Sequence, residues 1–430
     1  MKAVVYTLGC KVNDVESGSI IRGLEMLGFE ISREMEYADI YVVNTCAVTA
    51  EAERKSRQTV GKALKCNPNA KIIVCGCASQ KSPTAFLEKG ATVYAVTGAQ
   101  RKNKVLEIIR SGFAQGAQGI CLEEEKSYEE MLLPECLKTR NFVKIQDGCN
   151  RFCSYCIIPY LRGRIRSRKL ENVVAEIMAS TAHETVITGI DISDYKDENG
   201  NDLADLIFAI RYFEFRVRLG SLEVSAITPR LLENLHLLED FAPHFHLSLQ
   251  SGSNKVLKSM NRHYTREEYL EKCAMIYESF PNAAITTDII VGFPTETEED
   301  FQDSLKIVRE AKFSQIHVFP YSPREGTNAF KRYKELPAAV KKERVDRLLE
   351  GGNRARDAFV RKYIGRALMV IPESYHNGMT VGYSENYIRV YVEGEHDKSQ
   401  PLIVCVEGTF LDGALATRIS DRKAAQVYRK

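Results

Sequence analysis

Three cysteines stand close together in the middle of the chain, at positions 149, 153 and 156 within the run GCNRFCSYC. The run follows a stretch that is typical of a β-strand, so one compact loop carries all three thiols. Thiolates are the usual protein ligands of iron–sulfur clusters. Three thiolates hold three irons of a 4Fe–4S cluster and leave the fourth iron open to another ligand.

An open iron accepts a bidentate amino-acid ligand, and S-adenosylmethionine (SAM) offers one through its amino and carboxylate groups. An electron from the cluster then cleaves SAM into methionine and a 5′-deoxyadenosyl radical, which is chemistry that the cofactor supplies. Structural zinc is the alternative, but zinc takes four ligands, often from paired CxxC knuckles. Because no His or Cys stands near enough in sequence to complete such a set, the spacing favours the open cluster.

Three more cysteines, Cys10, Cys46 and Cys77, each follow a predicted strand near the N-terminus. Parallel sheets bring the carboxyl ends of their strands to one edge, where ligands bind. A single such cysteine is commonly a small buried hydrophobic residue, but three at equivalent strand ends favour a second 4Fe–4S cluster. Cys75 competes with Cys77, and we prefer Cys77 because a residue within the strand should point into the packing of the sheet. The other cysteines show no partner pattern and are expected to be structural: Cys66, Cys121, Cys136, Cys273 and Cys405.

The elements that position these cysteines alternate between strand and helix, which predicts an α/β protein. Residues 1–111 are expected to form an N-terminal parallel-sheet cluster domain, and residues 112–140, which are Gly-containing and then acidic, a connection. A helix is predicted over Asp14–Leu27, with Asn13 as its N-cap and Gly28 as its stop. The predicted strands of this domain are Lys2–Leu8, Ile40–Asn44, Lys71–Cys75 and Thr92–Val96.

The alternation resumes over residues 141–330 and predicts a partial (β/α)6 barrel. Its predicted strands are Asn141–Gln146, Thr185–Gly189, Arg216–Leu219, His244–Leu249, Ala284–Val291 and Gln315–Phe319. The predicted helices include Glu171–Thr181, Arg266–Glu278 and Glu298–Ala311. Residues 331–364 are predicted to form a charged helical linker. Short alternating runs with Gly turns predict a small all-β barrel over residues 365–430.

Composition sets the context of this chemistry. The 430-residue chain has a net charge of +2 and twelve cysteines, a high number for a reducing compartment, where clustered thiols indicate metal or redox chemistry. No apolar run approaches the roughly 20 residues that a membrane span needs. The start MKAVVYTLGCK is typical of a strand and not of a signal peptide. We therefore expect a cytoplasmic protein that does not insert into membranes.

The motifs around both cysteine sets resemble those of the methylthiotransferases, and the resemblance runs almost end to end. That family has an N-terminal cluster domain, a radical-SAM partial barrel and a C-terminal TRAM domain. Lys11-Val12-Asn13 and IIPYLRGR resemble the branch named MtaB, which adds a methylthio group to C2 of N6-threonylcarbamoyladenosine at position 37 of tRNA. The matching runs are GCKVN, NTCAVT, QDGCNRFCSYCIIPYLRGR, HLSLQSGSNKVLKSMNR, ITTDIIVGFPTETEEDF, FPYSPREGT and GYSENYIRV.

The resemblance implies two 4Fe–4S clusters and SAM in two roles, as methyl donor to sulfur on the N-terminal cluster and as the source of the radical. The adenine C2–H bond is not acidic enough for a side-chain base, so a radical is needed to open it. Sister branches act on isopentenyladenosine in tRNA or on an aspartate of a ribosomal protein. A zinc-stabilised RNA-binding protein without catalysis is the alternative from another class.

The resemblance also implies residues that contact SAM. The backbone of Tyr155 is expected beside the adenine, Arg262 is expected to pair with a carboxylate, and Val291 belongs to an apolar wall, IVGFP. The alternative for each polar residue is a satisfied loop or capping group. The remaining polar residues expected at strand ends around SAM are Ser221, Glu223, Gln250 and Ser251.

RNA contacts are indicated by basic residues. The segment from Arg151 to Lys169 contains six Lys or Arg and no acid, and residues 331–366 contain 12 Lys or Arg against five acids, although a solvated helical face explains the second run as well. Three tyrosines, Tyr383, Tyr387 and Tyr391, suit either base stacking or core packing. We expect a monomer that binds the tRNA anticodon stem-loop and receives electrons from a donor such as flavodoxin or ferredoxin. The residues predicted to contact RNA are Arg162, Arg164, Arg166 and Arg168.

Overall fold

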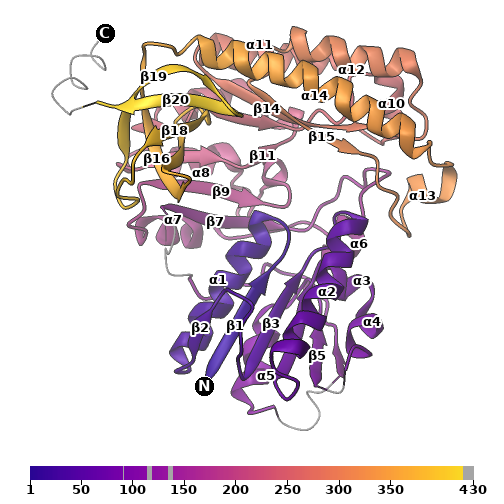
Figure 1. Cartoon of the computed structure of the whole chain (residues 1–430). Coiled ribbons are helices and arrows are strands. Elements are labelled where there is room, and N and C mark those ends of the chain that lie inside the picture. Colours follow the sequence, from indigo (N-terminus) through magenta and orange to yellow (C-terminus); the bar gives the residue numbers. More distant parts are fainter. Residues whose placement is uncertain (91, 114–118, 134–138, 420–430) are drawn as a thin grey trace.

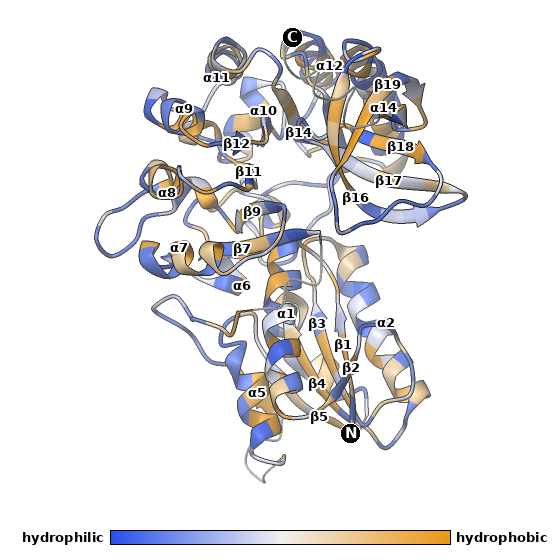
Figure 2. Ribbon diagram, turned by 90° about the vertical axis from the view of Figure 1, so that its left-hand side faces the viewer, coloured by the Kyte–Doolittle hydropathy of each residue, from blue (hydrophilic) through white to orange (hydrophobic). Residues whose placement is uncertain are grey.

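A computed structural model describes the chain except for residues 91, 114–118, 134–138 and 420–430. It contains an N-terminal sheet covered by helices, a partial barrel above it, and a small β-barrel beside the partial barrel (Figure 1). Figure 2 shows apolar strands inside the N-terminal sheet and polar residues on the outward faces of its helices. The predicted α/β fold class is therefore confirmed, whereas the exact residue boundaries of its units stay predictions.

The N-terminal sheet has six strands, all parallel, in the order β2-β1-β3-β4-β5-β6. Helices α1 and α5 pack on one face, and α2, α3 and α4 cover the other, each with apolar side chains turned toward the strands. The strands are β1 (Lys2–Thr7), β2 (Glu30–Ser32), β3 (Ile40–Thr45), β4 (Lys71–Gly76), β5 (Val93–Thr97) and β6 (Gly119–Cys121). The helices are α1 (Lys11–Met26), α2 (Ala50–Cys66), α3 (Cys77–Lys81), α4 (Pro83–Leu87) and α5 (Asn103–Arg110).

Three details of this sheet differ from the predictions, one of them being the additional short strand β2, which pairs with β1. The first helix begins at Lys11 with Cys10 as its N-cap, because Asn13 donates its side-chain amide to the carbonyls of Leu8 (2.7 Å) and Thr45 (3.1 Å) instead of capping the helix. The predicted connection also contributes a strand, β6, which extends the sheet by pairing with the edge strand β5. Its three residues are too short to give an alternating pattern in the sequence.

The partial barrel has six parallel strand positions, as predicted, divided between two sheets. The third position is broken at Gly220, so that β10 pairs with β9 while β11 pairs with β13. The strands are β7 (Arg140–Asp147), β9 (Glu184–Gly189), β10 (Arg216–Leu219), β11 (Ser221–Leu222), β13 (His244–Leu247), β14 (Ala284–Val291) and β15 (Gln315–Pro320), with short β8 (Arg166–Ser167) and β12 (Asp240–Phe241) at the edges. The helices are α6 (Ile158–Arg162), α7 (Leu170–Met178), α8 (Leu203–Ala209), α9 (Pro229–His236), α10 (Asn254–Ser259), α11 (Arg266–Ser279) and α12 (Glu298–Glu310).

The C-terminal part folds back onto the partial barrel. After α13 (Asn328–Arg332), the long helix α14 (Ala338–Arg361) packs against β15, where a Cβ on Gly352 would lie 2.4 Å from Ile316 Cγ1. The predicted linker is therefore part of the packed structure. A closed five-stranded barrel follows in the order β16-β17-β18-β20-β19. Its strands are β16 (Ala367–His376), β17 (Met379–Ser384), β18 (Arg389–Glu393), β19 (Leu402–Phe410) and β20 (Gly413–Arg418).

The small barrel packs against the amino ends of the strands of the partial barrel. Tyr387 stacks on His244, with ring centres 4.3 Å apart, and on Tyr383 at 4.6 Å, while Tyr391 is buried. The described contacts of these tyrosines thus support core packing over base stacking. None of the described helices combines the length and apolar composition needed to cross a lipid bilayer.

Candidate functional site

The loop that carries Cys149, Cys153 and Cys156 begins where β7 ends. Gly148 has a φ of +74°, and a Cβ there would lie 2.0 Å from the carbonyl oxygen of Arg164, so the entrance to the loop requires glycine. The amide of Cys149 donates to the carbonyl of Gly163 (3.1 Å), and that of Cys156 donates to the carbonyl of Cys153 (3.0 Å). Backbone contacts therefore fix the loop so that its three thiols line one pocket.

Five of the seven residues predicted to contact SAM line the same pocket as the three cysteines: Tyr155, Ser221, Glu223, Gln250 and Arg262. The other two do not reach it. Ser251 is fully buried and its hydroxyl accepts a hydrogen bond from the amide of Ser253 (3.3 Å). Val291 is fully buried in the apolar core of the partial barrel. The structure therefore does not bring Ser251 and Val291 to the pocket.

A series of ion pairs between arginines and carboxylates lines the pocket. Glu223 accepts from Arg262 Nη2 at 3.0 Å and lies 3.5 Å from Arg151 Nη1, while Arg262 Nη1 donates to the sulfur of Cys153 at 3.4 Å. Arg151 also pairs with Asp191 at 2.5 Å. Neither Arg151 nor Asp191 was among the residues predicted to contact SAM, although Arg151 lies within the cysteine loop and Asp191 follows the carboxyl end of β9. Cations and carboxylates facing one pocket suit a zwitterionic ligand such as an amino acid.

The thiols of Cys149 and Cys156 are held in their protonated form at neutral pH. Burial is the largest cause that raises the pKa of Cys149 and of Cys156 to about 12. A coordinating metal replaces the thiol proton, so metal binding would supply the thiolates that burial disfavours. Three convergent thiols beside a polar pocket fit a cluster with one open position.

The second set of cysteines converges at the carboxyl edge of the N-terminal sheet, next to the partial barrel. Burial is the largest cause that raises the pKa of Cys46 to about 11, and the Cys77 and Cys10 thiols add to the rise. A Cβ on Gly9 would lie 2.8 Å from the Cys46 sulfur, so the first loop passes directly over the second. Three thiols from three strand ends therefore face one another, as a three-cysteine cluster site requires.

Cys75 and Cys77 lie on opposite faces of the N-terminal sheet. Cys75 is buried among the side chains under α1 and α5, whereas Cys77 is the first residue of α3 and packs on the other face. Of the remaining cysteines, Cys66, Cys121, Cys273 and Cys405 belong to neither set, and Cys136 lies outside the described residues. The arrangement favours Cys77 as the third ligand.

Arg162 joins the two cysteine sets. Its side chain is fully buried and donates to Asn13 Oδ1 (2.7 Å), Glu16 Oε1 (2.8 Å) and Asp147 Oδ1 (3.0 Å). Its Nε has no hydrogen-bond partner among the described residues, and its charge lowers the pKa of the neighbouring Cys77 thiol against the rise caused by burial. An unused N–H beside Cys77 fits a thiolate ligand at that position.

The prediction that four arginines of this segment contact RNA is wrong for three of them. Arg162, Arg166 and Arg168 are buried and paired with acids, so they do not present guanidinium groups to RNA. Arg164 is exposed, with its guanidinium 4.5 Å from the centre of the Phe152 ring.

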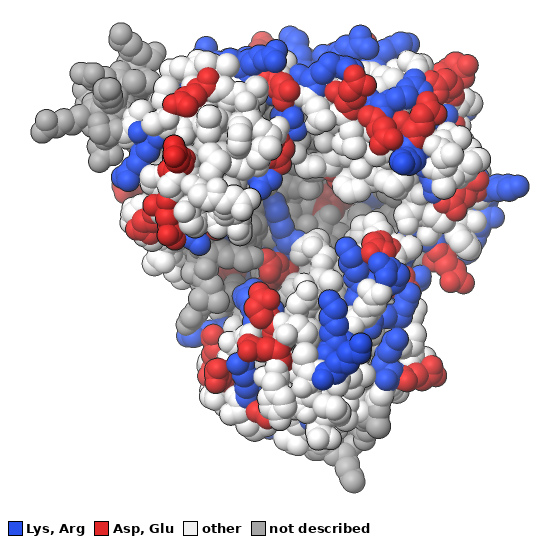
Figure 3. Space-filling view, viewed as in Figure 1, with Lys and Arg blue, Asp and Glu red and all other residues white. Residues whose placement is uncertain are grey.

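A basic face that the sequence analysis did not single out lies on α2, beside the entrance to the space between the N-terminal sheet and the partial barrel. Figure 3 shows Lys and Arg side chains gathered over this part of the molecule. Glu51 and Glu53 neutralise part of the charge. The spacing along one helical face was the signal available in the sequence. Its exposed or half-exposed residues are Arg54, Lys55, Arg57, Lys62 and Lys65.

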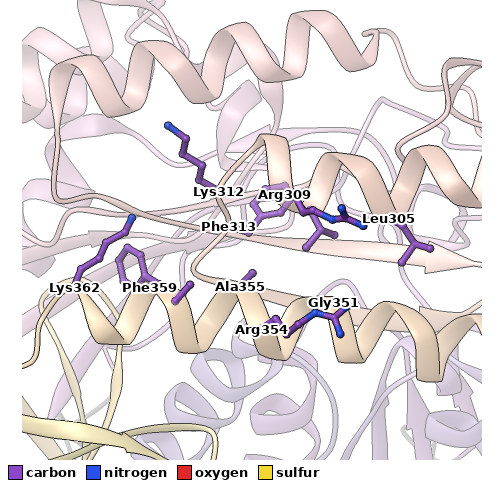
Figure 4. Close-up of a pocket in the computed structure, with 11 residues that line it drawn as sticks. Leu305, Arg309, Lys312, Phe313, Gly351, Arg354, Ala355, Phe359 and Lys362 are labelled. Atoms are coloured by element: carbon purple, nitrogen blue, oxygen red, sulfur yellow. The ribbon is translucent and has the colours of Figure 1, made fainter.

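A separate groove lies between α12 and α14 (Figure 4). Apolar side chains such as Leu305 and Phe359 line it, and Arg309 and Arg354 flank it. It contains none of the cysteines or predicted cofactor residues, so it is separate from the site described above.

Known proteins resemble the chain in sequence and in fold. Residues 143–308 match the radical SAM superfamily, and residues 2–98 match the uncharacterized protein family UPF0004. Threonylcarbamoyladenosine tRNA methylthiotransferase MtaB is 37% identical in Bacillus subtilis (91% of this chain, 90% of the relative) and 37% identical in Aquifex aeolicus (92% and 97%). The tRNA-2-methylthio-N(6)-dimethylallyladenosine synthase of Alkaliphilus oremlandii is 35% identical (86% and 82%).

Among solved structures, the radical SAM methyltransferase TsrM from Kitasatospora setae has a TM-score of 0.55 at 13% identity, covering 75% of this chain and 76% of that one. At this identity the likeness concerns the fold alone. The sequence matches favour an enzyme over a zinc-stabilised RNA-binding protein.

Proposed function

Because the chain belongs to the radical SAM superfamily and, within it, to the family of tRNA methylthiotransferases, we propose that it adds a methylthio group to C2 of N6-threonylcarbamoyladenosine at position 37 of tRNA. The observation that carries this proposal is the pair of three-cysteine sites. One lies beside a polar pocket in the partial barrel, and the other lies on the facing edge of the N-terminal sheet.

In this proposal Cys149, Cys153 and Cys156 hold the 4Fe–4S cluster that the radical SAM family implies. When SAM is bound there, the cofactor supplies the 5′-deoxyadenosyl radical that activates the substrate. Arg262 holds the SAM carboxylate, and Glu223 holds the amino group, because these two side chains line the pocket of the three cysteines and already pair with each other at 3.0 Å. Tyr155 borders the same pocket, where its backbone would lie beside the adenine of SAM.

We further propose that Cys10, Cys46 and Cys77 hold a second 4Fe–4S cluster, at which the sulfur is methylated and from which it is transferred. Asn13 supports this site, since it binds the carbonyls beside Cys10 and Cys46 and also accepts from Arg162. One buried network of hydrogen bonds thus holds both sites. It fixes the distance between the second cluster, which supplies sulfur, and the SAM site, which supplies the radical.

The tRNA anticodon stem-loop would enter between the N-terminal sheet and the partial barrel. The basic face of α2 lies beside that entrance, and exposed Arg164 lies over the Phe152 ring of the cysteine loop, so both suit contacts with phosphates. We propose that the enzyme acts as a monomer and that flavodoxin or ferredoxin supplies its electrons.

A second candidate substrate is dimethylallyladenosine, because a synthase that makes its methylthio derivative is 35% identical over most of this chain. Mass spectrometry of tRNA nucleosides separates the two. Cells lacking the gene should lose 2-methylthio-N6-threonylcarbamoyladenosine and regain it with the wild-type chain. Variants Cys153→Ala and Cys46→Ala should both fail to restore it, and Cys405→Ala, outside both sites, should restore it. Restoration of only the methylthio derivative of dimethylallyladenosine would contradict the proposal.

A further inference from the structure

Lys11 lies between the two halves of the proposed active site. It follows Cys10 directly, and its Nζ lies 5.7 Å from the centre of the Phe142 ring on β7. The side chain is solvent-exposed, yet burial is the largest cause that lowers its pKa, so protein surrounds it on several sides. Figure 3 shows a hollow between the N-terminal sheet and the partial barrel, with basic side chains visible inside it.

Lys11 is the cation of its surroundings that lacks a carboxylate partner among the described residues. Arg140 and Arg218 also lower its pKa, and these two guanidinium groups share the carboxylate of Glu184 at 2.7 and 2.8 Å. Glu373 pairs with Arg140 at 2.5 Å. Both guanidinium groups are thus paired with carboxylates, whereas Lys11 makes no ion pair within the described part of the chain. An anion from outside would give Lys11 a partner.

The neighbouring wall is polar. His246 on β13 lies 3.4 Å from Asp288 on β14, and His317 on β15 completes a cluster whose polar atoms lie within 4.8 Å of one another. All three are partly exposed, and the charge of Lys11 contributes to the lowered pKa of His317, after burial. A hydrocarbon group placed here would cover these polar atoms without replacing their hydrogen bonds to water, which costs free energy.

We propose that Lys11 binds the free carboxylate of the threonylcarbamoyl group and so selects a charged N6 substituent over a hydrocarbon one. The inference rests on the proposed function. The adenine must approach the site of Cys10 to receive sulfur, which brings the N6 substituent of the same base within reach of the next side chain. Lys11 is thus a specificity-determining residue that does not take part in the radical step.

The test compares two anticodon stem-loop RNAs, one with threonylcarbamoyladenosine and one with the methyl ester of its threonine carboxylate. The wild-type enzyme carrying its iron–sulfur clusters should modify the free-acid RNA with a kcat/KM on the order of 100-fold above that for the ester RNA. A loss of this size is expected when one charge-assisted contact is removed. Lys11→Met should lose that preference by slowing on the acid while the ester rate stays unchanged. Lys71→Met is the matched control, because Lys71 also lies over an aromatic ring, Tyr94 at 5.1 Å, but at the start of β4.

The binding constants of both RNAs, measured by fluorescence anisotropy, report the same contact without turnover. Lys11→Met should weaken the binding of the free-acid RNA and leave the binding of the ester RNA unchanged. An equal loss on both RNAs, or equal use of acid and ester by the wild type, overturns the inference and leaves the proposed function standing. A wild type that modifies only dimethylallyladenosine RNA overturns the proposed function itself, and this inference with it.

Discussion

Arg162 Nη2 donates a hydrogen bond to Asn13 Oδ1 over 2.7 Å, which joins the short helix after the Cys156 loop directly to the helix after Cys10. The same guanidinium neutralises Glu16 from the N-terminal sheet domain and Asp147 from the end of β7. Because all of these groups are buried, one arginine holds two distant segments of the chain at a fixed separation. The relative position of the two proposed cluster sites depends on it.

Replacing Arg162 should therefore destabilise the fold. In Arg162→Gln the carboxylates of Glu16 and Asp147 lose a buried partner, which costs about 3 kcal/mol or more in the free energy of unfolding. Chemical denaturation of the metal-free protein measures this change. The control is Arg164→Gln, whose exposed side chain should change stability by less than about 0.5 kcal/mol. Equal stability of the two variants would contradict the structural role of Arg162.

Arg164 is the arginine of this segment that we expect to contact RNA. Arg164→Ala should weaken binding of an anticodon stem-loop and reduce the slope of log affinity against log salt by about 1, as expected for one lost phosphate contact. Titrations at several salt concentrations measure both quantities. Arg211→Ala is the matched control, since Arg211 lies 4.1 Å from the Tyr212 ring on another part of the surface. A similar loss in both variants would show a general charge effect.

The contrast between Arg162 and Arg164 shows what the sequence reveals. The convergence of the strand-end cysteines was predictable, because alternation of strands and helices gives a parallel sheet in which the carboxyl ends of all strands lie at one edge. The burial of Arg162 was not, since its partner Glu16 stands 146 residues earlier. A local run of positive charge contains no sign of acids that tertiary packing brings to it. The same limit explains Ser251, whose place at a strand end did not reveal that its hydroxyl turns into the protein.

Two glycines should control the two cluster sites separately. Gly76 has a φ of +102°, and a Cβ there would lie 2.4 Å from the backbone oxygen of Thr45, so Gly76→Ala should displace Cys77. Gly148→Ala should likewise displace Cys149. Each variant should retain about four of the roughly eight irons of two 4Fe–4S clusters. Only Gly76→Ala should still form 5′-deoxyadenosine.

Gly28→Ala is the control for this pair, because its φ of +81° gives similar backbone strain while nothing lies within 4 Å of the added Cβ. It should keep the full iron content. Loss of all iron in Gly76→Ala would mean that the two sites do not assemble independently.

Arg262 should set the affinity for SAM. Lysine at this position keeps the charge but loses the fork that reaches both Glu223 and Cys153, so Arg262→Lys should raise the Kd for SAM about tenfold. Calorimetry with the iron-loaded protein measures this. Arg266→Lys, a change at the start of α11 where Arg266 pairs with Glu310 outside the pocket, should leave the Kd unchanged. An unaltered Kd in Arg262→Lys would remove Arg262 from the proposed contacts.

Acid should weaken the buried network through Glu16. Burial by itself would raise the pKa of Glu16, but the positive charges of Arg162, Lys144 and Lys102 outweigh it and hold the pKa at about 2. Because this value lies below that of an unfolded glutamate, about 4.3, the ionised form contributes stability above that pH. The contribution, on the order of 3 kcal/mol, is lost as the pH falls toward 2.

The free energy of unfolding of the metal-free protein should therefore decline more steeply between pH 5 and about pH 3 in the wild type than in Glu16→Gln. Glu25→Gln, on the partly exposed side of the same helix, should follow the wild type, and an unchanged slope in Glu16→Gln would assign the acid sensitivity to other groups.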